Sequence, residues 1–139
     1  MAPPFVYRVN RSALIRIPAA RGQSTRVELR CPDPSCNPYL ALAVCLRAGL
    51  DGIEKGMTPP TEIIENIFAM DNATRAQKGI ASLPGSLAEA VDTMLSDPLI
   101  TDTLGAHIIG QYTTGKRKEW DAYRTHVSRW ELDQYLTTY

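Results

Sequence analysis

Six arginines and one glutamate between two of them make the first 35 residues the part of the chain where chemistry is to be sought. The six cations include no lysine: Arg8, Arg11, Arg16, Arg21, Arg26 and Arg30. A guanidinium is permanently charged and has a planar geometry that can bind carboxylate or phosphate through two hydrogen bonds. Because only Glu28 and Asp33 oppose these six, residues 1–35 carry a net charge of +4, and the rest carries −4.

Glu28 lies in a segment with the alternation of a β-strand. Arg26, Glu28 and Arg30 share one face at intervals of about 6.6 Å, and the other face is apolar. Spacing alone leaves two interpretations open: a solvated ladder of charges, or a site where Glu28 holds a divalent cation beside bound anions. Arg11 and Arg16 on the preceding segment add positive charge. We therefore expect either an anionic ligand such as nucleotide phosphate, or acidic groups outside this chain.

Two strands are expected to position these side chains. Residues 9–17 and 25–31 are rich in β-branched and aliphatic residues, and each ends at a proline. They can pair as a hairpin or join a larger sheet. Since an isolated hairpin is marginally stable in water, we expect them to belong to a larger sheet.

The remainder is predicted to be helical. Asn37 followed by Pro38 starts a helix over 39–55 that is apolar all round, which is typical of a buried helix. Loops and a helical turn near 62–69 follow. Caps at Ser86, Asp97 and Ser128 then start three more helices, over 87–95, from Pro98 to about Val127 with a break near Gly105, and from 128 to the end. The expected fold class is α+β, mostly helical, with a short N-terminal β segment.

Composition limits the class of protein. The chain has 139 residues, 44% of them apolar, with 15 basic and 15 acidic side chains. This balance is typical of one globular domain and argues against a nucleic-acid-binding protein. The sequence contains no run of about 18 apolar residues, which a membrane-spanning helix would need. No basic-then-apolar signal sequence follows Met1, so we expect a cytoplasmic protein. The spacing of Cys31, Cys36 and Cys45 does not match a zinc site, and reduced thiols are expected.

Ordered blocks along nearly the whole chain resemble one enzyme family. The blocks are N-R-S-A-L-I-R-I-P at 10–18, T-R-V-E-L-R at 25–30, N-P-Y-L-A-L at 37–42, A-G-L-D-G-I at 48–53, L-P-G-S-L at 83–87, E-W-D-A-Y-R-T at 119–125 and W-E-L-D-Q-Y-L at 130–136. In this order they resemble the type I glutamine synthetases, and specifically the C-terminal part of the catalytic domain. The short strands would then belong to the larger catalytic sheet of that family.

The resemblance implies a set of roles. The family joins glutamate and ammonia through a γ-glutamyl phosphate, using ATP and divalent cations, Mg²⁺ or Mn²⁺. By analogy, Glu28 is a metal ligand and Arg30 binds glutamate. Arg11 is the catalytic arginine and contacts both glutamate and the ATP phosphate. Arg16 and Arg26 bind ATP phosphates. Arginines and metal ions suit phosphoryl transfer because they neutralise charge on the transferring group.

The resemblance also implies that residues 1–139 are one portion of that domain, with a β segment over 1–35 and a helical part over 36–139. The family's other metal ligands lie in sequence that precedes this portion, so we expect the isolated chain to be inactive. Other synthetase subunits, or the missing N-terminal part, are the expected partners. A non-catalytic module that binds a full-length synthetase or its regulators is the alternative. Phe68 replaces a tyrosine that is adenylylated in some relatives, so that control is not expected here.

Overall fold

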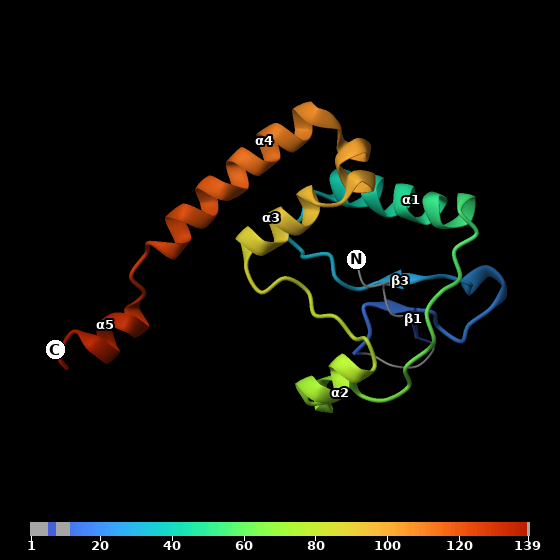
Figure 1. Ribbon diagram of the computed structural model, residues 1–139, viewed down its shortest axis with the longest axis horizontal. Helices are drawn as coiled ribbons and strands as arrows, with labels where there is room; N and C mark the ends of the chain where they lie inside the picture. The colour runs from blue at the N-terminus through green and yellow to red at the C-terminus, as the bar shows by residue number, and fades with distance from the viewer. Residues whose placement is uncertain (1–5, 8–11, 139) are drawn as a thin grey trace. The chain divides into compact units, whose positions relative to one another are not determined.

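The N-terminal segment forms a small three-stranded sheet. The computed structural model describes residues 6–7 and 12–138. Strands β1 (Val6–Tyr7), β2 (Ile15–Arg16) and β3 (Glu28–Leu29) lie in that order, with β1 parallel to β2 and β2 antiparallel to β3 (Figure 1). Of the two arrangements that the sequence left open for the predicted segments, the structure shows direct pairing, with β2 antiparallel to β3. Each strand spans only two residues, however, and β1 is an addition that the sequence analysis did not anticipate.

Helix α1 (Pro38–Glu54) matches its prediction closely. The Oδ1 atom of Asn37 accepts hydrogen bonds from the backbone N–H groups of Tyr39 and Leu40, at 3.0 and 3.3 Å. The proline at the first helical position costs no hydrogen bond, because an N–H there has no acceptor within the helix. Local sequence signals therefore fix where α1 begins.

The segment between α1 and the later helices is mostly irregular, as its prolines and glycines predict. A 3₁₀ turn, η2 (Ile67–Ala69), falls within the predicted helical turn near 62–69. Helix α2 (Asn72–Gln77) was missed by the sequence analysis. Its cap is visible in retrospect, because Asp71 Oδ1 accepts a hydrogen bond from the Thr74 N–H at 2.7 Å. A second 3₁₀ turn, η1 (Gly22–Ser24), lies between β2 and β3.

Three helices complete the chain and confirm the mostly helical α+β class. They are α3 (Leu87–Leu95), α4 (Pro98–Arg124) and α5 (Arg129–Tyr135). Each begins at its predicted cap, whose side chain accepts a hydrogen bond from a backbone N–H of the helix: Ser86, Asp97 and Ser128. Helix α3 packs against α4, and an ion pair between Asp92 Oδ1 and Arg117 Nη2, at 3.2 Å, joins the two helices.

The predicted break near Gly105 is confirmed as a single non-helical residue within α4. Gly105 has φ 74° and ψ 159°, a region of backbone space that is essentially restricted to glycine. A Cβ atom built at this position meets no described atom within 4 Å, so space for a side chain is not the constraint. The break therefore depends on backbone conformation alone.

Gly105→Ala is expected to lower the free energy of unfolding by about 1–3 kcal/mol, because alanine must adopt this disfavoured conformation or change the path of α4. Gly110→Ala is the matched control. Gly110 lies in the same helix without a positive φ, so alanine there is expected to stabilise the chain by about 0.5–1 kcal/mol. Urea denaturation of both variants measures the difference. Equal shifts in the two would contradict the backbone argument.

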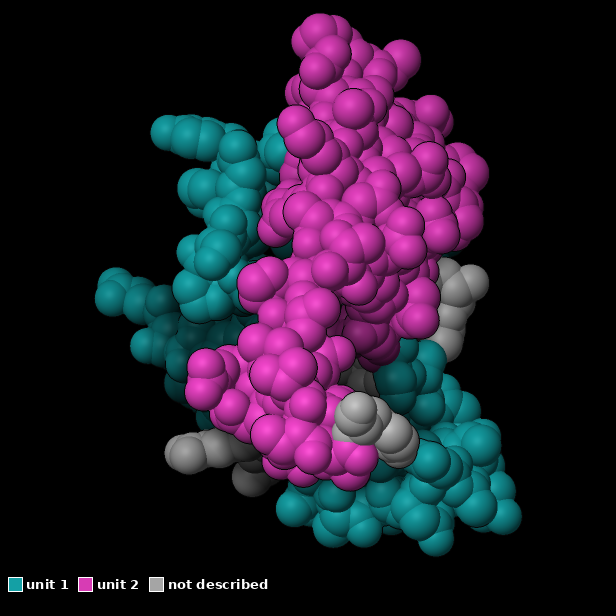
Figure 2. All heavy atoms as spheres, turned by 90° about the vertical axis from the view of Figure 1, so that its left-hand side faces the viewer, with its two compact units in different colours: residues 1–82 teal, residues 83–139 magenta. Residues whose placement is uncertain are grey.

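The described residues bury little apolar surface. The chain divides into two compact units, Met1–Ser82 and Leu83–Tyr139, coloured separately in Figure 2. Among the described residues, the buried aliphatic side chains are those of Ala13, Ile80 and Val91. Many large apolar side chains are exposed on both strands and helices, as expected of elements that lack part of their cover. No helix in the described part of the chain is long and apolar enough to cross a membrane.

Candidate functional site

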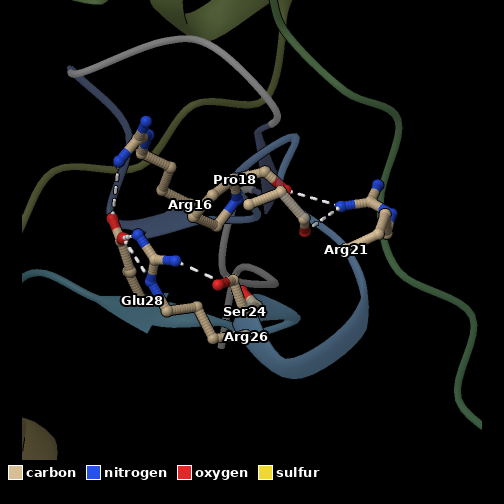
Figure 3. A network of polar contacts seen from close by, with 7 residues as sticks. Arg16, Pro18, Arg21, Ser24, Arg26 and Glu28 are labelled. Carbon is tan, nitrogen blue, oxygen red and sulfur yellow. Dashed lines mark hydrogen bonds and ion pairs between the residues drawn. The ribbon is translucent and has the colours of Figure 1, made fainter.

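Strand pairing places one carboxylate between two guanidiniums. Arg16 on β2 faces Glu28 on β3 in the antiparallel register. Arg16 Nη1 donates to Glu28 Oε2 at 2.8 Å, while Nε and Nη2 of Arg26 lie 2.9 and 2.7 Å from Oε1. Figure 3 shows both guanidiniums pointing to the carboxylate. The neighbourhood of Arg26 and Glu28, predicted from strand alternation, is confirmed, and the register adds Arg16. We call these three residues the Glu28 cluster.

The remaining N-terminal arginines are placed differently. Arg21 points away from the Glu28 cluster, and its Nη1 donates to the carbonyl oxygens of Pro18 and Ala20 at 2.6 and 2.9 Å (Figure 3). Arg30 follows the end of β3 and is exposed; its backbone N–H donates to the Leu14 carbonyl at 2.9 Å. Arg11, predicted to be catalytic, lies outside the described residues, as does Arg8. The structure therefore joins Arg16, Arg26 and Glu28 of the predicted site.

The two guanidiniums also determine the ionisation of the carboxylate. The hydrogen bond from Arg16, followed by that from Arg26, holds the pKa of Glu28 below its ordinary value of 4.5, although partial desolvation opposes the shift. The ionised form is therefore favoured in the folded chain. Its stabilising effect is complete above the unfolded pKa and is lost as the pH falls through the folded pKa.

We expect the ¹³C carboxyl resonance of Glu28 to titrate with a midpoint below 4.5. Arg16→Gln removes the hydrogen bond that contributes most to this shift, so its midpoint should move upward toward 4.5. NMR titration of parent and variant measures both. A parent midpoint at or above 4.5 would show that the arginines do not stabilise the ionised carboxylate in solution.

The Nε donor of Arg16 makes no hydrogen bond with the described residues. Its Nε atom is buried, and no hydrogen-bond acceptor for it is found among the described residues. A buried donor without a partner loses the free energy of hydration that it had in water. Since Nη1 of the same guanidinium already binds Glu28, an acceptor for Nε has to come from outside the described residues. A phosphate or carboxylate oxygen is the acceptor that an arginine fork suits best.

The cluster does not by itself form a metal site. Within residues 6–7 and 12–138, no group of three or more histidine, cysteine, aspartate or glutamate side chains is placed to hold a metal ion. Mg²⁺ requires near-octahedral coordination by oxygen atoms, and Glu28 offers one carboxylate. The residues present therefore do not fit a complete divalent-cation site, although Glu28 can supply one ligand to a site completed by other residues. Cys31, Cys36 and Cys45 form no disulfide in the structure.

A contact that sequence reasoning missed ties a distant loop to the β segment. The hydroxyl Oγ of Ser12 accepts a hydrogen bond from the backbone N–H of Ile67 in η2, at 3.0 Å, across 55 residues of sequence. Arg75, in the following helix α2, donates to the Met70 carbonyl at the end of this loop through both Nε and Nη2. Phe68, in the η2 turn of this loop, is 81% exposed and carries no hydroxyl. The sequence signal that could have indicated this contact is the position of Ser12 directly after Arg11, the predicted catalytic arginine.

Ser12→Ala is expected to increase hydrogen exchange at the Ile67 amide about three- to tenfold, the effect of losing a typical hydrogen bond. The Phe68 amide is the internal control, because it donates to Asn66 Oδ1 within the loop and keeps that acceptor. Residue-resolved hydrogen exchange by NMR distinguishes the two amides. A similar increase at both would indicate general loosening of the loop rather than loss of the Ser12 contact.

Known proteins resemble this chain over most of its length. The family model described as "Glutamine synthetase, catalytic domain" matches residues 6–135. The glutamine synthetase of Clostridium saccharobutylicum is 57% identical over 130 residues, and that of Thermus thermophilus is 54% identical over 130 residues. Each alignment covers 94% of this chain and 29% of the relative. The chain thus spans less than a third of the length of the curated relatives that it matches.

A solved structure described as apo GmaS without ligand is similar in fold. It superposes with a TM-score of 0.77 at 32% identity, covering 97% of this chain and 30% of the other. Sequence and structure thus agree over nearly all of the chain, from the β segment to the last helix. The chain belongs to the glutamine synthetase family and corresponds to part of its catalytic domain.

Proposed function

We propose that this chain supplies one portion of a glutamine synthetase active site, in which ATP-dependent ligation of glutamate and ammonia proceeds through γ-glutamyl phosphate. The remaining portion comes from glutamine synthetase sequence that this chain does not contain. The isolated chain is inactive, because a single carboxylate and a few arginines do not make a complete site. By extension from the family, the completed enzyme is cytoplasmic and oligomeric.

The residues have separate roles in this proposal. Arg16 and Arg26 bind ATP phosphates, and Arg30 binds the carboxylate of glutamate. Arg11 contacts both glutamate and the transferring phosphate as the catalytic arginine. Glu28 contributes one ligand to Mg²⁺ or Mn²⁺, which would neutralise phosphate charge when bound. In the chain itself, Glu28 orients the guanidiniums of Arg16 and Arg26.

One observation carries most of the proposal. The buried Nε of Arg16 has no acceptor among the described residues, while Nη1 of the same guanidinium is held by Glu28. A guanidinium fixed at one nitrogen and free at another is pre-organised to receive an anion, since its orientation is already determined. A simple solvated ladder of charges would leave each guanidinium nitrogen in water. The cluster therefore favours the ligand-site interpretation.

The test is a hybrid enzyme. Residues 6–135 of this chain replace the matched region of the Clostridium saccharobutylicum synthetase, to which they are 57% identical. We expect the hybrid to form glutamine from glutamate, ammonia and ATP, and Arg30→Ala to raise the KM for glutamate. A folded, assembled hybrid without activity would contradict the proposal, as would activity that survives both Glu28→Ala and Arg30→Ala.

The alternative is a non-catalytic module that binds an intact synthetase or its regulators. It predicts stable co-purification with a full-length synthetase and no dependence of that binding on Glu28. The hybrid enzyme separates the two functions, because only the first requires the Glu28 cluster for glutamine formation.

A further inference from the structure

Ser12 lies where the loop that contains η2 meets the β segment. Its Oγ atom accepts the hydrogen bond from the Ile67 N–H at 3.0 Å, a partly buried contact between segments 55 residues apart. The next residue, Ala13, is only 3% exposed, so burial also holds this stretch in place. Four positions after Ser12, Arg16 reaches the Glu28 carboxylate. Ser12 therefore connects the loop to the segment from which a proposed substrate-binding arginine projects.

The chain between Ser12 and Arg16 has a short regular part. Strand β2 contains two residues, which pair with β1 and with β3. Residues 12–14 form a turn and bends rather than strand, and the Leu14 carbonyl accepts a hydrogen bond from the Arg30 N–H at 2.9 Å. Because so little of this segment lies in the sheet, its path before Leu14 depends on the Ser12 contact and on the burial of Ala13.

The loop presents a fixed donor to Ser12. Ile67 is the first residue of η2, and the side chain of Asn66 caps this turn. At the end of the turn, Arg75 donates to the Met70 carbonyl through two nitrogens, at 3.2 and 3.1 Å. Since these contacts hold the Ile67 N–H in place, the loop can determine where the Ser12 hydroxyl lies.

The sequence position of Ser12 gives the contact its meaning. Arg11 directly precedes it and Arg16 follows four positions later, and the proposed function assigns both arginines to phosphate groups. We propose that Ser12 is a positioning residue of the synthetase site, which fixes the chain from which Arg16 reaches the ATP phosphates by accepting the Ile67 N–H. Ser12 itself touches no substrate. This inference deepens the proposed function and rests on it.

The first test is kinetic and uses the hybrid enzyme. Ser12→Ala is expected to lower kcat/KM for ATP about 10- to 100-fold, because a displacement of about 1 Å from productive geometry can cost 100-fold in rate. The KM for glutamate should stay within about threefold, since Arg30 follows the other strand, β3. Ser12→Thr keeps a hydroxyl and should restore most of kcat/KM. Equal changes in both substrates, without rescue by threonine, would indicate a structural role alone and overturn the proposal.

Ile67→Pro removes the same hydrogen bond from the loop side. Proline has no N–H and is tolerated at the first position of a helical turn. Asn66 already has the extended conformation, φ −69° and ψ 107°, that a following proline favours. Ile67→Pro should lower kcat/KM for ATP as Ser12→Ala does, whereas Ile67→Val, which keeps the N–H, should not. The double variant Ser12→Ala/Ile67→Pro should be no worse than either single variant; losses that multiply would contradict a shared bond.

Ser86→Ala is the matched control for loss of a serine hydroxyl. Ser86 Oγ accepts from the Glu89 N–H at 3.2 Å, a contact of the same kind in the other compact unit. This variant should keep the parental kcat/KM for ATP. A parental value in Ser12→Ala as well, in an active hybrid, would overturn the positioning role and leave the proposed function intact.

A second measurement, on the 139-residue chain, does not depend on catalysis. NMR relaxation gives the order parameter of the Arg16 Nε–H group, which Ser12→Ala should lower. The Arg124 Nε–H group is the internal control, because it donates to Asp121 Oδ1 at 2.7 Å in the other unit and should not change. If the hybrid is inactive but Arg16 becomes more mobile in Ser12→Ala, the proposed function alone is wrong. If Arg16 stays as ordered as in the parent, the positioning inference is wrong.

Discussion

Replacing Glu28 by glutamine is expected to lower glutamine formation by the hybrid enzyme on the order of 100-fold, the typical effect of losing one pre-organised electrostatic contact in an active site. Glutamine has nearly the same shape, but it lacks the negative charge that attracts Arg16 and Arg26. It is also a poor ligand for Mg²⁺ compared with a carboxylate. The change therefore removes two proposed contributions of Glu28 while preserving side-chain volume.

Glu65→Gln is the matched control for this prediction. Glu65 forms an ion pair with Lys78, and that interaction lowers the pKa of Glu65 in the same direction as for Glu28. It lies in the loop after α1, away from the Glu28 cluster in sequence. Steady-state assays with ATP, glutamate and ammonia should show near-parental rates for Glu65→Gln. A comparable loss in both variants, or parental rates in both, would contradict the proposal that Glu28 belongs to the active site.

Local signals explain which parts of the fold were predictable. The starts of α1, α3, α4 and α5 depend on a capping side chain and the residues directly after it. A short stretch of sequence is therefore enough to predict each of them. The break at Gly105 is likewise a property of one residue. The length of a strand, by contrast, depends on its neighbours in the sheet, and β2 and β3 are accordingly shorter than the patterns of 9–17 and 25–31 predicted.

The candidate site likewise has contacts that the sequence predicts and contacts that it does not. Strand alternation predicts that Arg26 and Glu28 share a face, because they lie two positions apart in the sequence. The contact between Arg16 and Glu28 requires the register of β2 against β3, which sequence spacing does not determine. The hydrogen bond from the Ile67 N–H to Ser12 is longer in range still, and depends on how the loop folds back. The buried, unpaired Nε of Arg16 became visible only with the structure.

The second large effect is expected from Arg16→Lys, a change that retains the positive charge. A lysine ammonium can still attract the Glu28 carboxylate, but it lacks the planar fork that binds one group at Nη1 and another at Nε. Hydrogen bonds to charged groups contribute about 1.5–3 kcal/mol, so the KM for ATP should rise roughly 10- to 100-fold. The KM for glutamate should change little, because Arg30 and Arg11 are proposed to bind that substrate.

Arg117→Lys provides the matched control, since Arg117 also forms an ion pair with a carboxylate, that of Asp92, but lies on α4 in the other compact unit. Its KM for ATP should stay within about twofold of the parent, as expected for an exposed ion pair of small net effect. Initial rates measured against ATP concentration in both variants decide the outcome. An unchanged KM for ATP in Arg16→Lys would mean that charge alone suffices, and that the unpaired Nε is not a phosphate donor.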